Sequence, residues 1–148
     1  MINLREIITE EMLMECISLE VSEAQDEHID DNATSMSLAW YHRDSTKPLC
    51  IYNDDEMVGF TLLYFHHDEN ECEIWQFMID VEHQGKGYGK AAVNATVEYI
   101  KNNYPELTEI HLATFPENDV AIKMYEGCGF VLTDEILDDE EIVMRYIK

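Results

Sequence analysis

The sequence feature that most restricts the fold is an apolar stretch that runs through a glycine-rich turn into a helical repeat. The apolar stretch is EIWQFMIDV, residues 73–81, and the turn after it, HQGKGYGKAA, contains Gly85, Gly87 and Gly89. Apolar and small residues then recur at helical spacing: Ala92, Val93, Thr96, Val97 and Ile100. This pattern predicts a buried strand, a tight turn and an amphipathic helix over about residues 87–103, in direct succession.

The glycine turn favours a phosphate group. Free N–H groups at the start of a helix attract anions, and glycine permits both positive φ and close approach of a ligand. Lys86 and Lys90 add positive charge to a chain whose formal net charge is −23. The spacing GxGxG matches neither the GxGxxG dinucleotide fingerprint nor the GxxxxGK[ST] P-loop. A turn that is merely tight is the alternative interpretation.

The remaining pattern predicts one mixed α/β domain over residues 1–148, in the order β α α β β β α β α β β. No repeat, low-complexity tract or linker divides it. Helices are expected after Thr9, after Asp31 or Asn32, and over residues 118–130. The strands are predicted at residues 2–8, 49–53, 57–65, 73–81, 108–114, 131–137 and 141–147.

The charge balance argues against two classes of partner. The chain has 32 Asp and Glu against 9 Lys and Arg, whereas nucleic-acid binders need basic patches and anionic membranes repel acidic proteins. We see no signal peptide and no apolar run near the roughly 20 residues of a membrane span. The acidity serves either solubility or a cationic ligand. Four cysteines without a CxxC pair suggest reduced thiols and a cytoplasmic location.

A second motif follows later in the chain. In ENDVAIKMYEGCGF the spacing is three, four, four and one between Asn118, Ala121, Tyr125, Gly129 and Phe130. With QGKGYG at residues 84–89, it resembles the GCN5-related N-acetyltransferase (GNAT) superfamily, whose motifs are Gln/Arg-x-x-Gly-x-Gly/Ala and Asn-x-x-Ala-x-x-x-Tyr-x-x-x-Gly-Phe. The resemblance implies a GNAT fold: a mixed, mostly antiparallel sheet of about seven strands, flanked by four helices and splayed at the acetyl-CoA site.

The resemblance also implies roles at that site. The backbone of Phe77, Met78 and Ile79 would pair with the pantetheine arm of acetyl-CoA like an added strand. Asn118 would hydrogen-bond the coenzyme, act as a helix N-cap, or both. Tyr125 would protonate the departing sulfur, with a core aromatic as the alternative. The pyrophosphate would be held by the backbone amides of Gln84, Gly85, Lys86, Gly87, Tyr88, Gly89 and Lys90.

The implied transfer is a direct attack of an amine on the thioester, and we expect no metal. An alkylammonium of pKa ~10.4 costs about 4–5 kcal/mol to deprotonate at neutral pH. A phenol near pKa ~10 is a weaker acid than a thiol near ~8.5 by about 2 kcal/mol, so Tyr125 would act mainly as a hydrogen-bond donor. The N–H near Met78 would bind the thioester oxygen. Cys128 is interpreted as a packing residue.

Within the superfamily, the chain most resembles the bacterial spermine and spermidine N-acetyltransferases, in LEVSEAQDEHID, YNDDEMVGF and IWQFMIDVEHQGKGYGKA. A polycation needs spaced carboxylates. Related enzymes often have an acidic residue where this chain has Trp75, so we expect Glu73 to bind the amine or act as a base through water. Trp75 would then offer its ring to an ammonium. The other candidates are Glu20, Glu23, Asp26 and Glu27.

Several alternatives stay open at this point. Asp26 and Glu27 also fit a solvated loop, and Glu135 with residues 138–141 is expected to form a solvated hairpin. The acceptor could instead be an aminoglycoside or a protein amine, or the chain could bind CoA without turnover. Tyr125 and Asn118 favour an enzyme over a CoA-binding module. Since relatives are commonly dimers, we also expect a homodimer.

Overall fold

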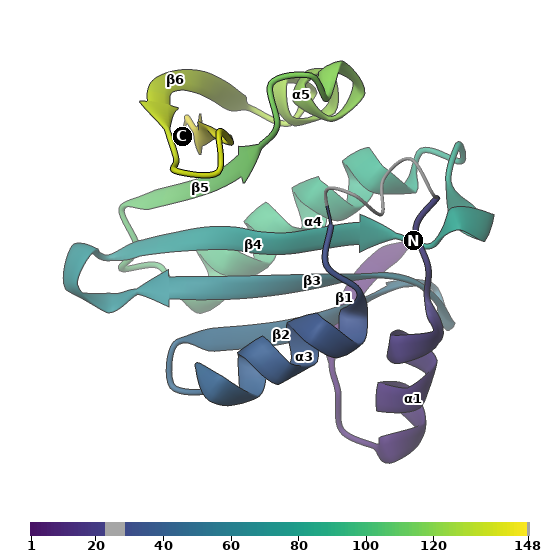
Figure 1. Ribbon diagram of the computed structural model, residues 1–148. Helices are drawn as coiled ribbons and strands as arrows, with labels where there is room; N and C mark the ends of the chain where they lie inside the picture. The colour runs from purple at the N-terminus through teal and green to yellow at the C-terminus, as the bar shows by residue number, and fades with distance from the viewer. Residues whose placement is uncertain (23–28, 148) are drawn as a thin grey trace.

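The computed structural model describes residues 1–22 and 29–147, and it arranges seven strands in one sheet (Figure 1). The strand order is β1-β2-β3-β4-β5-β7-β6, and every neighbouring pair is antiparallel except β4 and β5. The expected mixed, mostly antiparallel sheet is therefore confirmed. The strands are β1 (Ile2–Glu6), β2 (Thr46–Asn53), β3 (Glu56–His66), β4 (Glu71–Ile79), β5 (Glu109–Thr114), β6 (Phe130–Ile136) and β7 (Ile142–Tyr146).

Four helices flank the sheet in the described residues: α1 (Glu10–Ser18), α3 (Asn32–Tyr41), α4 (Tyr88–Asn103) and α5 (Asp119–Gly127). Side chains cap the first two, because Thr9 accepts a hydrogen bond from Met12 N at 3.1 Å and Asp31 accepts one from Thr34 N at 2.7 Å. None of these helices is both long and apolar enough to span a bilayer.

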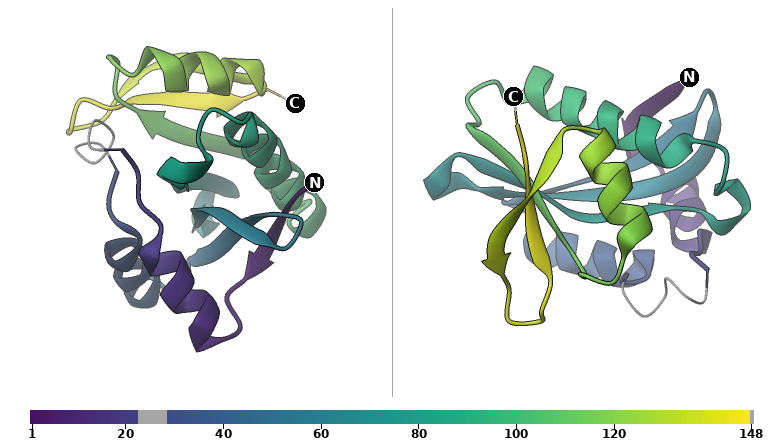
Figure 2. Two further views of the ribbon diagram at one scale, coloured as in Figure 1. Left: turned by 90° about the vertical axis from the view of Figure 1, so that its right-hand side faces the viewer. Right: turned by 90° about the horizontal axis from the view of Figure 1, so that it is seen from above.

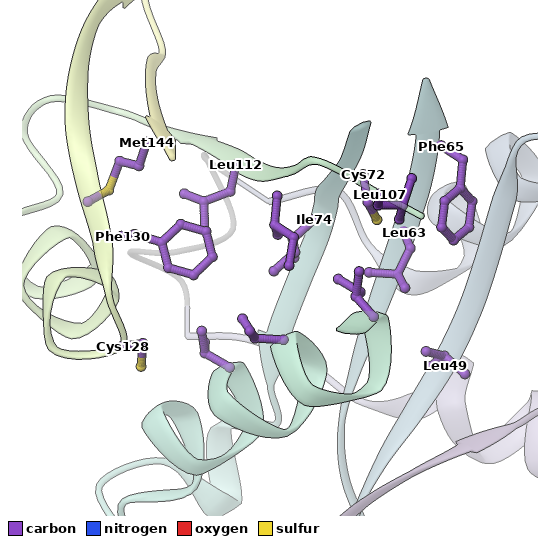
Figure 3. Packing of buried hydrophobic residues seen from close by; sticks show 14 residues of the cluster. Leu49, Leu63, Phe65, Cys72, Ile74, Leu107, Leu112, Cys128, Phe130 and Met144 are labelled. Carbon is purple, nitrogen blue, oxygen red and sulfur yellow. The ribbon is translucent and has the colours of Figure 1, made fainter. Parts of the chain in front are cut away.

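Two hydrophobic cores lie on opposite faces of the sheet. The helices α1 and α3 cover one face, and α4 covers the other (Figure 2). On the α4 face, Phe130, Leu112 and Met144 from the C-terminal strands pack with Ile74 of β4 (Figure 3). Side chains alternate between the two faces along each strand, so β4 contributes to both cores.

The parallel pair β4 and β5 comes apart partway along its length. The two strands pair only between residues 71–73 and 109–111, and beyond this they diverge (Figure 1). A register shift opposite Leu62 and Leu63 leaves Trp75 as an extra residue in β4. From residue 74 onward, β4 pairs with β3 alone, which gives the splayed sheet that the resemblance to the GNAT superfamily implied.

The bounds of every strand differ from the prediction by one to three residues at one end or both, and α5 ends three residues early; two of these differences have a clear physical reason. The strand β2 begins at Thr46 and therefore includes Pro48. The pairing of β2 with β1 starts only at Leu49, so Pro48 has no partner in β1. Proline is tolerated there because that edge of β2 needs no donor. The helix α5 ends at Gly127 instead of residue 130, because Gly129 adopts a φ of +99° and Phe130 already begins β6.

Candidate active site

A cleft of about 1170 Å³ fills the space between the diverging strands β4 and β5. Its walls come from β4, the glycine turn with the start of α4, the end of β5 with α5, and the loop between β6 and β7. Ligand pockets usually measure about 300–1,000 Å³, so this cleft has room for a long cofactor and a second substrate.

The glycine turn forms one end of the cleft. Gly85 and Gly87 adopt φ values of +78° and +81°, and a Cβ at either position would meet no atom within 4 Å. Backbone conformation, not space, therefore requires glycine there. Of the four helices described, α4 alone has no side-chain cap, so its first N–H groups are left for a ligand.

The remaining residues of the turn divide into ligand-facing and structural roles. Gln84 donates from Nε2 to Ile79 O at 2.9 Å, and the Tyr88 hydroxyl accepts from Asn53 Nδ2 at 3.1 Å. A Cβ on Gly89 would lie 2.9 Å from Met124 Sδ, so glycine there permits close packing of α4 on α5. All the candidates from Gln84 to Lys90 line the cleft except Lys86, whose side chain is exposed outside it.

The backbone of β4 forms a wall beside the turn. Phe77, Met78 and Ile79 line the cleft, and each pairs with β3 but not with β5. Their outward N–H and C=O groups are therefore positioned for an extended ligand that adds a strand. Met78 and Ile79 are also buried, which holds this edge in place.

The opposite wall comes from α5. Asn118 caps this helix, because its Oδ1 accepts from Ala121 N at 3.4 Å, and it also lines the cleft, so the structure is compatible with both roles. Tyr125 lies on the cleft wall with its ring 6.1 Å from that of Phe130. Burial raises the pKa of its phenol to about 12, which keeps the hydroxyl protonated and able to donate.

The other end of the cleft is acidic. Four carboxylate side chains line it, those of Asp30, Glu73, Asp139 and Glu141, together with the Trp75 ring. Burial, followed by the neighbouring Asp139, raises the pKa of Glu141 to about 7. The predicted solvated hairpin is therefore wrong for Glu141, which the hairpin turns into the cleft.

Other acidic candidates lie elsewhere. Glu135 is exposed and pairs with Arg145 at 2.9 Å, as expected for a hairpin on the surface. Glu20 is exposed and outside the cleft wall, and its backbone N–H donates to Asp80 Oδ1 at 2.9 Å. The candidates Glu23, Asp26 and Glu27 lie outside the described residues.

Glu73 stands between two histidines. Its Oε1 lies 3.1 Å from His66 Nε2 and 3.8 Å from His111 Nε2. Burial alone would raise the pKa of Glu73, but the His111 and His66 imidazoles outweigh it and hold the pKa below its ordinary value. At neutral pH this carboxylate therefore carries a negative charge at the acidic end of the cleft.

Sequence reasoning missed several of these residues. His66 and His111 are far apart in the chain, and Asp139 and Glu141 belong to a segment that looks like an ordinary charged turn. Asp30 lies just before the helix cap Asp31, and its Oδ2 accepts from Gln76 Nε2 at 3.2 Å. No local pattern links these positions, because strand register and the divergence of β4 from β5 bring them together.

The splayed sheet opens a cleft with an uncapped helix start at one end and a phenol on the facing wall. This arrangement is typical of acyl-transfer enzymes that bind an extended, phosphate-bearing donor. Comparison with known proteins makes this specific, since the model of the acetyltransferase (GNAT) family matches residues 7–130. The chain belongs to the GNAT family, and it is an acetyl-CoA-dependent N-acetyltransferase.

Individual relatives agree with this assignment. The spermine/spermidine N(1)-acetyltransferase of Bacillus subtilis is 33% identical over 104 residues, which cover 66% of this chain and 68% of that protein. The spermidine N(1)-acetyltransferase of Vibrio cholerae is 30% identical over 128 residues, 86% of this chain and 66% of that protein.

Solved structures share the fold. The aminoglycoside acetyltransferase AAC(6')-Ib in complex with coenzyme A superposes with a TM-score of 0.78 at 23% identity, over 100% of this chain and 95% of that one. Vibrio cholerae spermidine N-acetyltransferase in complex with CoA and spermine superposes with a TM-score of 0.69 at 21% identity. The match covers 97% of this chain and 92% of that one.

Proposed function

We propose that this enzyme acetylates a primary amine of a polyamine such as spermine, spermidine or a diamine. The observation that carries the proposal is the acidic end of the cleft, which Asp30, Glu73, Asp139 and Glu141 line together with Trp75. Spaced carboxylates attract a ligand with spaced ammonium groups, and an aromatic face binds one of them. The names of the bacterial relatives support the same substrate class.

The features of the cleft support acetyl-CoA as the acetyl donor. The uncapped start of α4 and the positive φ of Gly85 and Gly87 suit the pyrophosphate. The open edge of β4 at Phe77, Met78 and Ile79 suits the pantetheine arm, and Lys90 adds positive charge. In this proposal Lys86 contributes through its backbone and long-range charge alone.

Tyr125 is proposed to assist departure of the thiolate. With a phenol pKa of about 12, full proton transfer to a thiolate of ordinary pKa, near ~8.5, is uphill by about 5 kcal/mol. The hydroxyl therefore acts as a hydrogen-bond donor while charge grows on the sulfur, and the sulfur takes its proton late. The N–H groups near Met78 would stabilise the oxyanion.

The attacking amine must lose a proton before it can attack. Carboxylates that bind an ammonium raise its pKa, so we assign Asp30, Asp139 and Glu141 to the ammonium groups that do not react. Glu73, which lines the cleft on β4, is proposed to orient the amine and the water that takes its proton. The reacting nitrogen then lies toward Tyr125, where it is less hydrated.

Assembly and location are proposed with the same function. The edge strand β6 exposes Val131, Leu132 and Ile136 by 45%, 46% and 66%, which supports a homodimer formed through this edge. The cysteines Cys16, Cys50, Cys72 and Cys128 are free and buried, in keeping with a reducing cytoplasm. Light scattering of the purified protein measures the assembly state.

A panel of amines tests the function. The purified enzyme is given acetyl-CoA with spermine, spermidine, putrescine, kanamycin or a lysine peptide, and the acetylated product is identified by mass. We expect turnover with the polyamines and much slower turnover with the other two acceptors. Turnover with kanamycin or the peptide alone would reject the polyamine assignment. Stabilisation by CoA without turnover of any amine would indicate a CoA-binding module.

A further inference from the structure

A cluster of two histidines and one glutamate lies at the acidic end of the cleft, where three strands run side by side. His66 ends β3, Glu73 belongs to β4 and His111 belongs to β5. Glu73 pairs directly with His111, and His66 pairs with Glu71, which lies two residues before Glu73 in β4. The strand residues next to them, Phe65, Cys72, Ile74, Ile110 and Leu112, belong to the core on the α4 face, so the three side chains share the opposite face.

The ligand atoms of this cluster already lie close together. Glu73 Oε1 is 3.1 Å from His66 Nε2 and 3.8 Å from His111 Nε2, and all three ligand atoms are within 4.8 Å of one another. The two imidazole rings are stacked with centroids 5.4 Å apart. Zinc bonds of about 2.0–2.1 Å in a tetrahedron separate the ligand atoms by about 3.4 Å. Small side-chain rotations are therefore sufficient to close this cluster around an ion.

The far side of His111 supplies the support that a metal ligand needs. Its Nδ1 is buried, has no hydrogen-bond partner among the residues that the structure describes, and lies 3.7 Å from Glu71 Oε2. A carboxylate behind a ligating histidine selects the tautomer and orients the ring. With the proton on Nδ1 facing Glu71, the Nε2 lone pair points at the cluster.

A neighbouring group of acids is a weaker candidate. Glu71, Glu109 and His111 also lie within 4.8 Å of one another. However, the Arg145 guanidinium contacts Glu109 and places a positive charge beside that group. A second cation would be repelled there, so Glu71 and Glu109 serve better as outer groups than as ligands.

We propose that His66, Glu73 and His111 bind a divalent transition-metal ion, with Zn²⁺ as the best match, and that this ion competes with the amine substrate for Glu73. Two imidazoles and one carboxylate suit zinc, whereas Ca²⁺ and Mg²⁺ need oxygen-rich sites. Glu73 also lines the cleft, so an ion bound there removes a carboxylate from the acceptor. The proposal of metal binding does not depend on the proposed function. The proposal of competition with the amine rests on the proposed function.

Titration with Co²⁺, without coenzyme or amine, tests binding directly. Co²⁺ is visible by absorption where Zn²⁺ is silent, and excess Mg²⁺ with about 0.15 M salt suppresses loose binding to the acidic surface. We expect a saturable tetrahedral spectrum at a single equivalent, displaced by Zn²⁺. The spectrum should disappear in His66→Asn and His111→Asn and persist in the control His67→Asn, a change at an exposed neighbour.

A graded variant separates metal binding from folding. Glu71→Gln keeps all three ligands and should weaken metal affinity by roughly 10–100-fold. Thermal unfolding of each metal-free variant checks that the fold is intact. The absence of a saturable spectrum in the native chain, or a spectrum unchanged in both histidine variants, would overturn the proposal.

Inhibition of acetyl transfer tests the competition. Acetylated amine is measured by mass, because zinc also binds the free thiol of CoA. We expect Zn²⁺ to raise the KM for spermine in the native enzyme, but not in His66→Asn or His111→Asn. Metal binding without an effect on this KM would reject the competition alone. Acetylation of spermine without any metal binding would reject the metal site and leave the proposed function standing.

Discussion

The two ends of the cleft recognise charge in opposite ways. At the glycine turn, the proposed contacts come from the uncapped backbone N–H groups of α4, with Lys90 on the cleft wall beside them. At the other end, side chains from β4, Asp30 and the β6–β7 loop provide the charge. Backbone donors have a fixed position once the turn forms, whereas carboxylates depend on burial and protonation. The first end therefore suits a constant cofactor, and the second suits a substrate that can vary between relatives.

The largest effect on activity should come from substitution of Tyr125, at the boundary between the two ends of the cleft. Tyr125→Phe removes the hydroxyl that we propose assists thiolate departure, and we expect kcat to fall by about 10²–10⁴-fold. The KM for acetyl-CoA and the KM for spermine should each stay within about twofold, because neither end of the cleft has changed. Steady-state kinetics measure this, and an unchanged kcat would remove Tyr125 from the chemistry.

The second effect concerns pH. At subsaturating amine, kcat/KM should rise about tenfold per pH unit from about pH 6 to 8, because only the neutral amine attacks. Tyr125 does not limit this range, since its pKa of about 12 keeps the phenol protonated. Initial rates with spermidine in constant ionic strength measure the slope. A flat profile would contradict the proposed deprotonation before attack.

The third effect should be confined to the cofactor end. Gly87→Ala places a side chain at a φ of +81°, which costs about 1–2 kcal/mol and disturbs the first amides of α4. We expect the Kd for CoA to rise by about tenfold, which corresponds to about 1.4 kcal/mol. Calorimetric titration with CoA measures the change.

Gly127→Ala is the matched control for this change. Its Cβ would make ordinary contacts, 3.5–3.6 Å from Lys90, without a positive φ. Its CoA affinity should stay near that of the native enzyme. Equal losses in the two variants would show that general packing, and not the turn, sets the affinity.

The smallest effect should be confined to the acceptor end. The pKa of Glu141 is raised from 4.5 to about 7, so the folded state retains a proton there that the unfolded chain releases. The contribution of Glu141 to the free energy of unfolding is therefore fully present below about pH 4.5, and it is lost as the pH rises toward 7. Glu141→Gln should stabilise the fold by about 1 kcal/mol near pH 8, after discounting for partial exposure, and by almost nothing near pH 4.

The same variant should bind polyamines less well. We expect the KM for spermine to rise about fivefold near pH 8, equivalent to about 1 kcal/mol for one lost charge pair. Asp138→Asn, at an exposed position of the same turn outside the cleft wall, is the control. Denaturant melts at both pH values measure the stability change, and a stability gain near pH 4 would contradict the raised pKa.

Much of the cofactor end could be predicted from sequence. Glycines at positive φ and the spacing Asn118 to Phe130 are local patterns, and Gly85, Gly87, Asn118 and Tyr125 from them line the cleft, whereas Phe130 is buried in the core. The order of strands and helices was likewise readable from apolar periodicity, with errors of one to three residues at the ends of the strands and of α5. The acceptor end was predicted less well, since Glu141 was expected in solvent and His66 was not considered.

The sequence by itself determined the fold class and the glycine turn at the uncapped start of α4, because backbone conformation and helix starts depend on residues close together in the chain. Only the tertiary structure decided the acceptor end, where β3, β4, β5 and the β6–β7 loop bring distant side chains together. The register of three strands puts His66, Glu73 and His111 on one face, and the divergence of β4 from β5 opens the cleft beside them. Both depend on contacts between segments that are remote in sequence.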